Sequence, residues 1–276
     1  MDNIRYLTDK ARNIRKRLLK MIFDAKGGHT GGSLSSVEIL VTLYFEIMNV
    51  DPNDPKKEDR DRFILSKGHS VESYYCVLSD AGFFPDEWLQ TYGKFNSPLA
   101  GHPINKIPGI EINSGSLGHG LSVGVGMALA NKLDGRDSLV YVLMGDGEQA
   151  EGSVLEAAMA AGNYKLDNLV GIIDRNRLQI SGDTEEIMRL DSLPNRYGSL
   201  GWEIKEINGN SFKELIEAFN RVPFIKDHPS LIIANTTKGK GVSFIENKAE
   251  WHHKVPSEQE LLQALEELDN QTGESG

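Results

Sequence analysis

The sequence predicts an α/β protein in which helices cover both faces of a mostly parallel sheet. Its strands read as nearly continuous apolar runs, at 139–144, 169–173 and 231–235, as expected for strands buried on both faces. Amphipathic stretches with helical spacing separate these runs. With 276 residues the chain can bury a large core. We therefore expect one domain over residues 1–270 and a flexible tail over 271–276.

An apolar stripe predicts that the chain opens with a helix. Apolar residues recur every three or four positions from Ile4 to Ala25, and the pattern ends at Gly27. A second helix is expected to start at Ser35, because Ser35 and Glu38 have the spacing of a capping box ahead of another apolar stripe.

Loops dominate the next part of the chain. The polar stretch 51–61 is expected to be a loop, followed by a buried strand at 63–65 and a helix at 71–81. Residues 99–118 lack periodicity, and loops of this length in compact domains are usually functional. A helix is expected over 121–133. Close approach of another backbone is indicated by the glycines in and before that helix, Gly120, Gly124 and Gly126.

From residue 139 onward, strands and helices alternate. The expected order is strand 139–144, helix 153–162, strand 169–173, strand 202–207, helix 212–221, strand 231–235 and helix 258–268. Such an alternation builds a parallel sheet. Ligands of open parallel sheets bind at the carboxyl ends of the strands, so the residues that follow each strand are the first candidates for a ligand site.

Composition narrows the classes of function. The formal net charge is −10 and the pI is near 5.2, which argues against nucleic acid or an anionic membrane as a partner. A single cysteine, Cys76, provides no disulfide framework and no thiolate cluster. No apolar run is long enough to span a membrane, and the N-terminus lacks a signal-peptide core. We expect a cytoplasmic protein that binds small metabolites and other proteins.

Two strands are followed by side chains suited to a hard cation. Asp146, within Gly145-Asp146-Gly147, ends one apolar run, and Asn176 ends the next. Mg²⁺ takes six oxygens, several of them from phosphate and water, and the bend after Asn176 offers the carbonyl of Leu178. Gly147 allows a diphosphate to approach the backbone N–H groups, and the following helix points its positive end there. A Gly-Asp-Gly sequence by itself is more often a turn.

Histidines in glycine-flanked loops are candidates for proton transfer. His29, His69 and His102 all have such settings, whereas 252–253 follow a basic, glycine-rich segment. Each alone is more often a structural or surface histidine, but three in like settings favour a catalytic role. His228 is expected to be an ordinary turn residue.

Taken together, these segments resemble a known family. Gly145 to Gly152 and Asp174 to Leu178 resemble the thiamine diphosphate and magnesium motif of thiamine enzymes. Similarity to transketolases in particular is carried, in the family's order, by Gly28-His29-Thr30-Gly31, Leu65-Ser66-Lys67-Gly68-His69, Gly101-His102-Pro103 and Gly115-Ser116-Leu117-Gly118-His119-Gly120. The similarity runs from about Ala11 to about Leu265. Where this chain has Ser116 and His119, the family more often has proline and glutamine, so the subgroup stays open.

The resemblance implies roles for particular residues. Mg²⁺, replaceable by Ca²⁺ or Mn²⁺, would be held by Asp146, Asn176 and the carbonyl of Leu178. The cofactor would be contacted by His69, Gly115, Ser116, Leu117, Gly147, Glu151, Asn176 and a late histidine. His29, His102 and the late histidine would contact the hydroxyls of the ketose and assist proton transfer. We place the late histidine at His253, with His252 as the alternative.

Acidic residues at a helix N-terminus are also stabilising without any catalysis, so Glu151 and Glu156 keep that second interpretation.

The resemblance covers only the diphosphate-binding part of a transketolase. It implies an N-terminal subunit that transfers a two-carbon ketol unit between sugar phosphates, and that is active only with a C-terminal subunit carrying the pyrimidine-binding domain. Two copies of each chain are expected in a heterotetramer. Alternatives are a relative of deoxyxylulose-phosphate synthase, the α subunit of a 2-oxo-acid dehydrogenase, or a non-catalytic cofactor-binding subunit. The histidine set disfavours the dehydrogenase.

Overall fold

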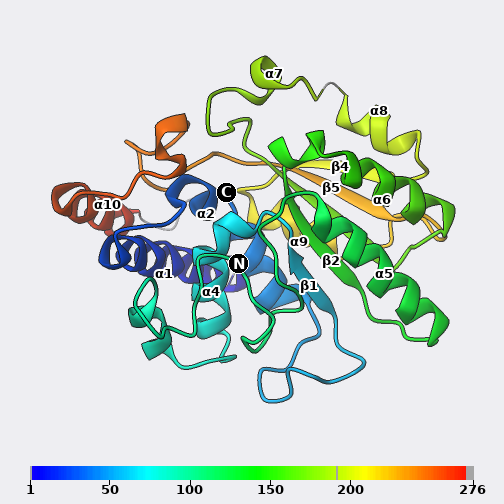
Figure 1. Ribbon diagram of the computed structural model, residues 1–276, viewed down its shortest axis with the longest axis horizontal. Helices are drawn as coiled ribbons and strands as arrows, with labels where there is room; N and C mark the ends of the chain where they lie inside the picture. Colours follow the sequence, from blue (N-terminus) through cyan, green and yellow to red (C-terminus); the bar gives the residue numbers. More distant parts are fainter. Residues whose placement is uncertain (1, 191, 272–276) are drawn as a thin grey trace.

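A five-stranded sheet forms the centre of the molecule (Figure 1). The computed structural model describes residues 2–190 and 192–271. Within them the strand order is β1-β2-β3-β5-β4, and each strand runs parallel to its neighbours. The strands are β1 (Arg62–Leu65), β2 (Val140–Gly145), β3 (Leu169–Arg175), β4 (Glu203–Asn208) and β5 (Ser230–Asn235). The predicted fold class is thus confirmed.

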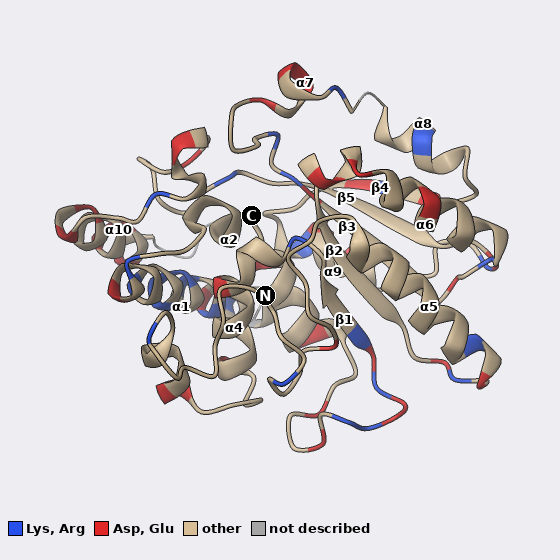
Figure 2. Cartoon of the chain, viewed as in Figure 1, with Lys and Arg blue, Asp and Glu red and all other residues tan. Residues whose placement is uncertain are grey.

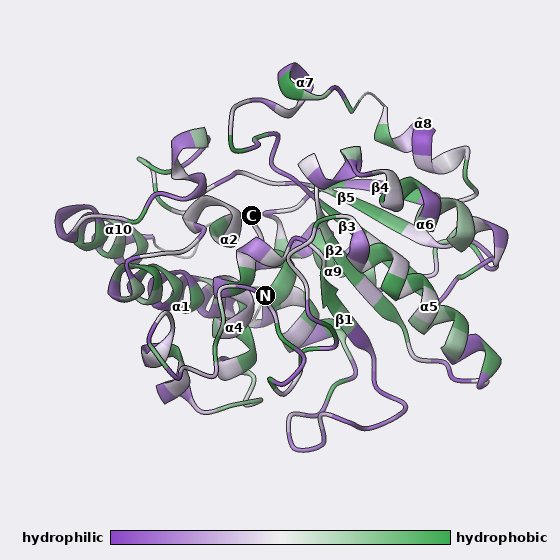
Figure 3. Cartoon of the chain, viewed as in Figure 1, coloured by the Kyte–Doolittle hydropathy of each residue, from purple (hydrophilic) through white to green (hydrophobic). Residues whose placement is uncertain are grey.

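Helices cover both faces of this sheet. They are α1 (Asp2–Ala25), α2 (Thr30–Ser35), α3 (Val37–Thr42), α4 (Val71–Asp80), α5 (His119–Leu133), α6 (Gly152–Asn163), α7 (Thr184–Ile187), α8 (Leu193–Gly198), α9 (Phe212–Phe219) and α10 (Glu258–Asn270). One apolar core joins α1, α3, α4, α9 and α10 to one face, and a second core joins α5, α6 and α8 to the other. The inner strands are correspondingly apolar along most of their length (Figure 3).

The second predicted helix starts earlier than its sequence pattern indicates. The helix begins at Thr30 and is split into α2 and α3, so the expected start at Ser35 is wrong. The Ser35 hydroxyl donates to Asp174 in β3 at 2.6 Å, and Glu38 forms a buried ion pair with Arg15 of α1 at 2.6 Å. Both side chains of the expected capping box are therefore committed to other elements.

The glycines of α5 differ in what surrounds them. A Cβ on Gly120 would lie 2.9 Å from the Cα of Ser66, and one on Gly124 would lie 2.5 Å from a methyl carbon of Val142. A Cβ on Gly126 would meet nothing within 4 Å. Close approach of another backbone is thus confirmed at Gly120, whereas Gly124 packs against side chains and Gly126 faces open space, so the prediction is wrong at those two positions. Lys132 is the one Lys, Arg, Asp or Glu residue of this helix (Figure 2).

Several short helical segments have no counterpart in the sequence-based expectations, among them α7, α8 and the 3₁₀ turns at Asp86–Thr91, Gly147–Ala150 and Ala249–His252. At the C-terminus, Gln271 donates from its side chain to the Gly241 carbonyl, and its own carbonyl accepts from Arg12. The rest of the expected tail, 272–276, lies outside the described residues. Among the described helices, none combines the length and the apolarity needed to cross a membrane.

Candidate active site

The carboxyl ends of β1, β2 and β3 open onto a cleft of about 420 Å³. The residues that line it are His29, Gly32, Lys67, His69, Gly115, Leu117, Gly145, Asp146, Gly147, Glu148, Glu151, Asn176, Leu178, Gln179, Ile180, Ser181, Lys238, His252 and His253. This set contains every predicted site residue except His102 and Ser116. The cleft lies where open parallel sheets hold their ligands.

Asp146 and Asn176 lie at one end of this cleft. Asp146 follows β2 and is 3 % exposed; its carboxylate accepts N–H groups from Gly147 at 2.8 Å and from Arg177 at 2.6 Å. The amide oxygen of Asn176 accepts from the N–H of Leu178 at 3.1 Å. Arg177 has a φ of +64°, a left-handed conformation that non-glycine residues rarely adopt. This turn brings the segment after β3 back onto Asp146.

Electrostatics at Asp146 suit a bound cation. Burial, with the charge of Asp174 adding to it, raises the pKa of Asp146 to about 6. A buried carboxylate is stabilised when a cation replaces the lost hydration. A carboxylate, an amide oxygen and a backbone carbonyl are also the oxygen ligands that Mg²⁺ accepts. The residues present therefore fit a divalent ion.

The carbonyl of Leu178, the third predicted ligand, accepts a hydrogen bond from Lys238 at 2.9 Å. Lys238 follows β5, is 1 % exposed, and also contacts Nδ1 of His252 at 2.9 Å. Burial and the nearby Lys67 lower the pKa of Lys238 to about 8. Sequence analysis did not single out this lysine, although its glycine-rich segment was noted. It adds a positive charge where a diphosphate would lie.

A buried ion pair underlies the cleft. Lys67, which follows β1, binds Asp174 of β3 and donates to the Gly32 carbonyl at 3.1 Å. Burial alone would raise the pKa of Asp174, but the Lys67 ammonium and the hydroxyls of Ser35 and Thr236 hold that pKa below its ordinary value. The pair fixes the ends of two strands relative to α2. Neither residue was predicted, because a buried pair of this kind has no local sequence signal.

Glu148 shapes the loop that precedes α5. Its carboxylate accepts N–H groups from Gly118 at 2.8 Å and from Gly145 at 3.0 Å, and the hydroxyl of Ser66. Gly118 has a φ of +85°, and a Cβ there would lie 2.7 Å from Cβ of Glu151. The loop carrying Gly115 and Leu117 is thus tied to the end of β2. Glu148 was also missed by sequence analysis.

Four histidines gather around His29. The ring centroid of His29 lies 4.4 Å from that of His253, 5.4 Å from His69, 5.8 Å from His252 and 6.1 Å from His102. Burial lowers the pKa of His29 to about 4, that of His252 to about 3, and that of His69 well below its ordinary value. The rings of His29, His252 and His69 are neutral at pH 7, so each can accept or donate a hydrogen bond.

A buried carboxylate positions His29. Glu72 of α4 accepts the backbone N–H of His29 at 3.0 Å, the hydroxyl of Ser33 at 2.6 Å and the phenol of Tyr92 at 2.9 Å. His29 is thereby held where α2 begins. Sequence analysis did not identify Glu72, which lies within an apparently ordinary helical stretch.

Both candidates for the late histidine reach the cluster. His252 stacks on His69 at 5.3 Å and contacts Lys238, which also donates to the Leu178 carbonyl. His253 is more exposed and packs on His29. His119 is exposed, with one ring nitrogen 3.2 Å from the Leu117 carbonyl. His228 contacts the Gly201 carbonyl at 2.9 Å and does not line the cleft.

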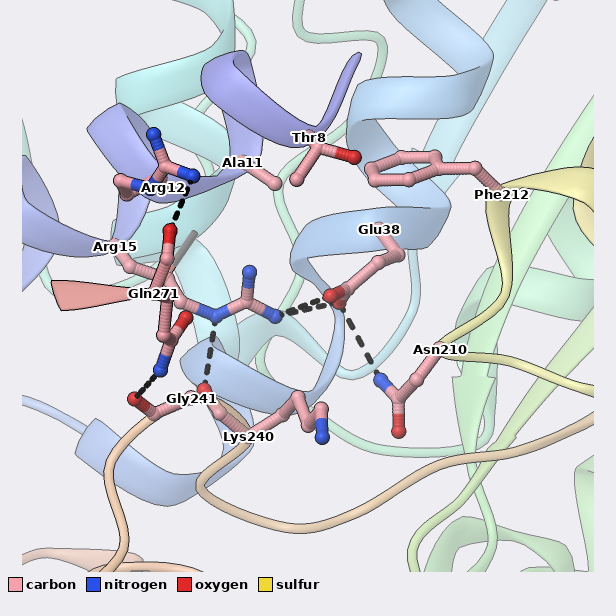
Figure 4. Close-up of a pocket in the computed structure, with 10 residues that line it drawn as sticks. All are labelled: Thr8, Ala11, Arg12, Arg15, Glu38, Asn210, Phe212, Lys240, Gly241 and Gln271. Atoms are coloured by element: carbon pink, nitrogen blue, oxygen red, sulfur yellow. Dashed lines mark hydrogen bonds and ion pairs between the residues drawn. The ribbon is translucent and has the colours of Figure 1, made fainter. Parts of the chain in front are cut away.

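A second cavity is structural rather than catalytic in character (Figure 4). It measures about 40 Å³, which is room for only a few water molecules. Arg15 spans it, donating to Glu38 at 2.6 Å and to the Lys240 carbonyl at 2.8 Å. These contacts tie α1, α3 and the segment after β5 together.

Comparison with known proteins agrees with this geometry. The family model described as "Transketolase, thiamine diphosphate binding domain" matches residues 8–272. The chain belongs to this family. It is 54 % identical over 254 residues to one of the subunits of the apulose-4-phosphate transketolase of Phocaeicola vulgatus, covering 92 % of this chain and 90 % of that protein. To the 6-deoxy-6-sulfo-D-fructose transketolase subunit SqwG of Clostridium sp. (strain MSTE9) it is 40 % identical, covering 96 % and 97 %.

Among solved structures, the transketolase of Campylobacter jejuni superposes with a TM-score of 0.91 at 31 % identity. The match covers 95 % of this chain but 42 % of that transketolase, so the chain spans less than half the length of this relative. Family membership makes the chain a subunit-type transketolase, of the enzyme class that transfers aldehyde and ketone groups, built on a thiamine diphosphate-binding domain. The predicted family, fold and enzyme class are confirmed.

Proposed function

We propose that this chain, with a second chain, transfers a two-carbon ketol unit from a ketose phosphate to an aldose phosphate, using thiamine diphosphate and Mg²⁺. One observation carries the proposal. The predicted cation ligands Asp146 and Asn176 and the predicted proton carriers His29 and His253 line the same cleft. A diphosphate held at one end would present the rest of the cofactor toward the histidines.

Asp146, Asn176 and the carbonyl of Leu178 would hold the metal. Lys238 would give up its bond to that carbonyl and balance the diphosphate charge instead. His69, Gly115, Ser116, Leu117, Gly147 and Glu151 are proposed to contact the cofactor, which supplies a thiazolium carbon able to break and form carbon–carbon bonds. Its site on this chain combines a cation pocket with apolar and glycine-rich walls.

His29, His102 and His253 are proposed to contact the sugar and relay protons. The low pKa of His29 favours its neutral form, which can accept a proton from a sugar hydroxyl and return it. Glu72 fixes the backbone of His29, so the ring's position is set before substrate arrives. The exposed His102 and His253 lie at the outer side of the cluster, toward an incoming sugar.

A partner chain is proposed to supply the pyrimidine-binding domain. The relatives from P. vulgatus and Clostridium are named as subunits, and each is nearly the length of this chain. We infer a heterotetramer with two copies of each chain, acting in the cytoplasm. Activation of the cofactor needs a carboxylate from the other domain, so this chain alone should be inactive.

The names of those relatives direct the choice of donor. Apulose 4-phosphate is the first candidate for this chain, and 6-deoxy-6-sulfo-D-fructose is the second. The test is co-expression of this chain with the product of the neighbouring reading frame, followed by assays of each donor with an aldose phosphate acceptor. Turnover of a ketose donor by the pair, and by neither chain alone, is the expected result.

Two rival functions give different results in the same assay. A relative of deoxyxylulose-phosphate synthase, or a 2-oxo-acid dehydrogenase subunit, would consume pyruvate and show no ketose activity. A non-catalytic cofactor-binding subunit would bind thiamine diphosphate and turn over none of these donors with any candidate partner. Either outcome would refute the proposed transfer.

A further inference from the structure

His29, His252 and His253 form a cluster with ligand spacing for a metal. The coordinating nitrogens available on the three side chains lie within 4.8 Å of one another. Zinc bound by three histidines has Zn–N distances of about 2.0–2.1 Å, which places tetrahedral ligand nitrogens about 3.4 Å apart. Each ring would need to move by less than about 1 Å to reach that spacing, and His253 is exposed enough to do so.

The chemistry of the three rings favours a transition metal over Mg²⁺. Imidazole nitrogen is a preferred ligand of zinc, copper and nickel, whereas Mg²⁺ selects oxygen. A metal needs the unprotonated ring, and His29 and His252 are both neutral at pH 7. The cluster is therefore chemically distinct from the oxygen ligands at Asp146.

His29 is already oriented as a metal ligand. Its Nδ1 is buried without a hydrogen-bond partner and lies 4.0 Å from the carboxylate of Glu72. With Nδ1 on the side of Glu72, Nε2 is the nitrogen that would bind a metal. Histidine ligands commonly direct their second ring nitrogen toward a carboxylate, which fixes the tautomer and strengthens the donor.

The charged residues around the cluster affect how strongly it could bind a metal ion. Lys238 contacts Nδ1 of His252 at 2.9 Å, so a metal on that nitrogen would displace the lysine. A metal on Nε2 would place the ring proton on Nδ1, against an ammonium that cannot accept it, so either mode of binding requires Lys238 to move away from His252. Lys67 is paired with Asp174, and Glu72 adds a negative charge behind His29. The ammonium of Lys238 thus repels the metal, and the buried carboxylate of Glu72 attracts it.

We propose that His29, His252 and His253 bind one divalent transition-metal ion, of which Zn²⁺ is the probe, in the outer part of the cleft. The fourth position stays open to water, as in three-histidine zinc sites. The consecutive histidines at 252 and 253 are what supply the second and third ligands. Among the described residues, no other group of three or more His, Cys, Asp or Glu side chains has metal-ligand spacing.

The test is calorimetric titration of the full chain with Zn²⁺, without thiamine diphosphate, supported by the visible spectrum of bound Co²⁺. We expect one ion per chain, and at least about a tenfold loss of affinity in His253→Gln, because one of three ligands is removed. His119→Gln is the matched control, since His119 is also exposed but lies outside the cluster. It should bind as the unmodified chain does.

Asp146→Asn separates this site from the proposed Mg²⁺ site. Zinc binding that persists in Asp146→Asn and is lost in His253→Gln supports the histidine site. No binding to the unmodified chain, binding unchanged in His253→Gln, or binding lost in Asp146→Asn would each overturn it. None of these readouts needs catalytic activity, so the result stands whether or not ketol transfer is found.

Discussion

At the residue scale, the proposed metal site depends most on Asp146. Its carboxylate is buried, its pKa is raised to about 6, and two backbone N–H groups fix its orientation. We predict that Asp146→Ala abolishes Mg²⁺-dependent binding of thiamine diphosphate in the two-chain complex, measured by calorimetry. His228→Ala, which lies outside the cleft, should change the affinity by less than about twofold. Unaltered affinity in the Asp146 variant would refute the metal assignment.

The two adjacent histidines allow a second prediction at this scale. His252 contacts Lys238 and stacks on His69, whereas His253 packs on His29 at the exposed side. We therefore propose that the cofactor contact implied for the late histidine is made by His252 rather than by His253. In the active complex, His253→Gln should raise the KM for the ketose donor about tenfold and leave cofactor affinity unchanged. Steady-state kinetics at saturating cofactor measures this effect. A KM at the unmodified value, with weakened cofactor binding, would assign His253 to the cofactor instead.

Sequence alone locates the residues that lie directly after strands or in glycine-flanked loops. Asp146, Asn176, His29 and His69 were identifiable because a local pattern marks each of them, and the structure brings them into one cleft. The buried partners Lys67, Glu72, Glu148, Asp174 and Lys238 were not singled out, although Lys67, Glu148 and Asp174 lie within the segments that resemble the family motifs. Their importance comes from contacts that include pairs 30, 43 and 107 positions apart, which only the folded chain reveals.

At the scale of elements, helix α5 provides a matched pair of glycines. Gly124 faces Val142 in β2 and Gly126 faces open space. Gly126→Ala should stabilise the isolated chain by about 0.5–1 kcal/mol, because alanine is the better helix former. Gly124→Ala should destabilise it by about 1–3 kcal/mol through overpacking. Urea denaturation of both variants tests this, and equal shifts would contradict the packing of α5 on β2.

The same scale shows where sequence patterns fail. The strands were predicted to within a few residues, and β2, β3 and β5 were marked by continuous apolar runs. The exception is β4, which contains Glu203, Lys205 and Glu206. The start of α2 was missed because Ser35 and Glu38, which mimic a capping box, are instead bound to Asp174 and Arg15. Both partners lie far from Ser35 and Glu38 in the sequence, so a local pattern could not predict where this helix begins.

At the scale of the whole molecule, the neutral histidines make folding depend on pH. The unfolded chain takes up protons on His29 and His252 below their ordinary pKa of 6.5, but the folded chain resists until about pH 4 and about pH 3, respectively. Their contribution to stability is therefore complete above pH 6.5 and lost as the pH falls. We predict that the drop in urea midpoint from pH 7.5 to 5 is smaller in His252→Gln than in the unmodified chain.

Asp146→Asn is the control in that experiment, because it should change the drop in urea midpoint in the opposite direction. The pKa of Asp146 is higher in the folded chain than the ordinary 3.8, so this group favours folding as the pH falls below about 6. Its removal should enlarge the drop in midpoint. Equal drops in all three proteins would mean that these groups titrate alike in the folded and unfolded states.

The central claim is that a divalent cation joins a diphosphate to Asp146 and Asn176. Anomalous diffraction from crystals of the two-chain complex, grown with Mn²⁺ and thiamine diphosphate, tests it most directly. We predict one strong anomalous peak within bonding distance of the Asp146 carboxylate, the Asn176 amide oxygen and the Leu178 carbonyl. Bound cofactor with no peak there, or a peak only at another place in the chain, would contradict it.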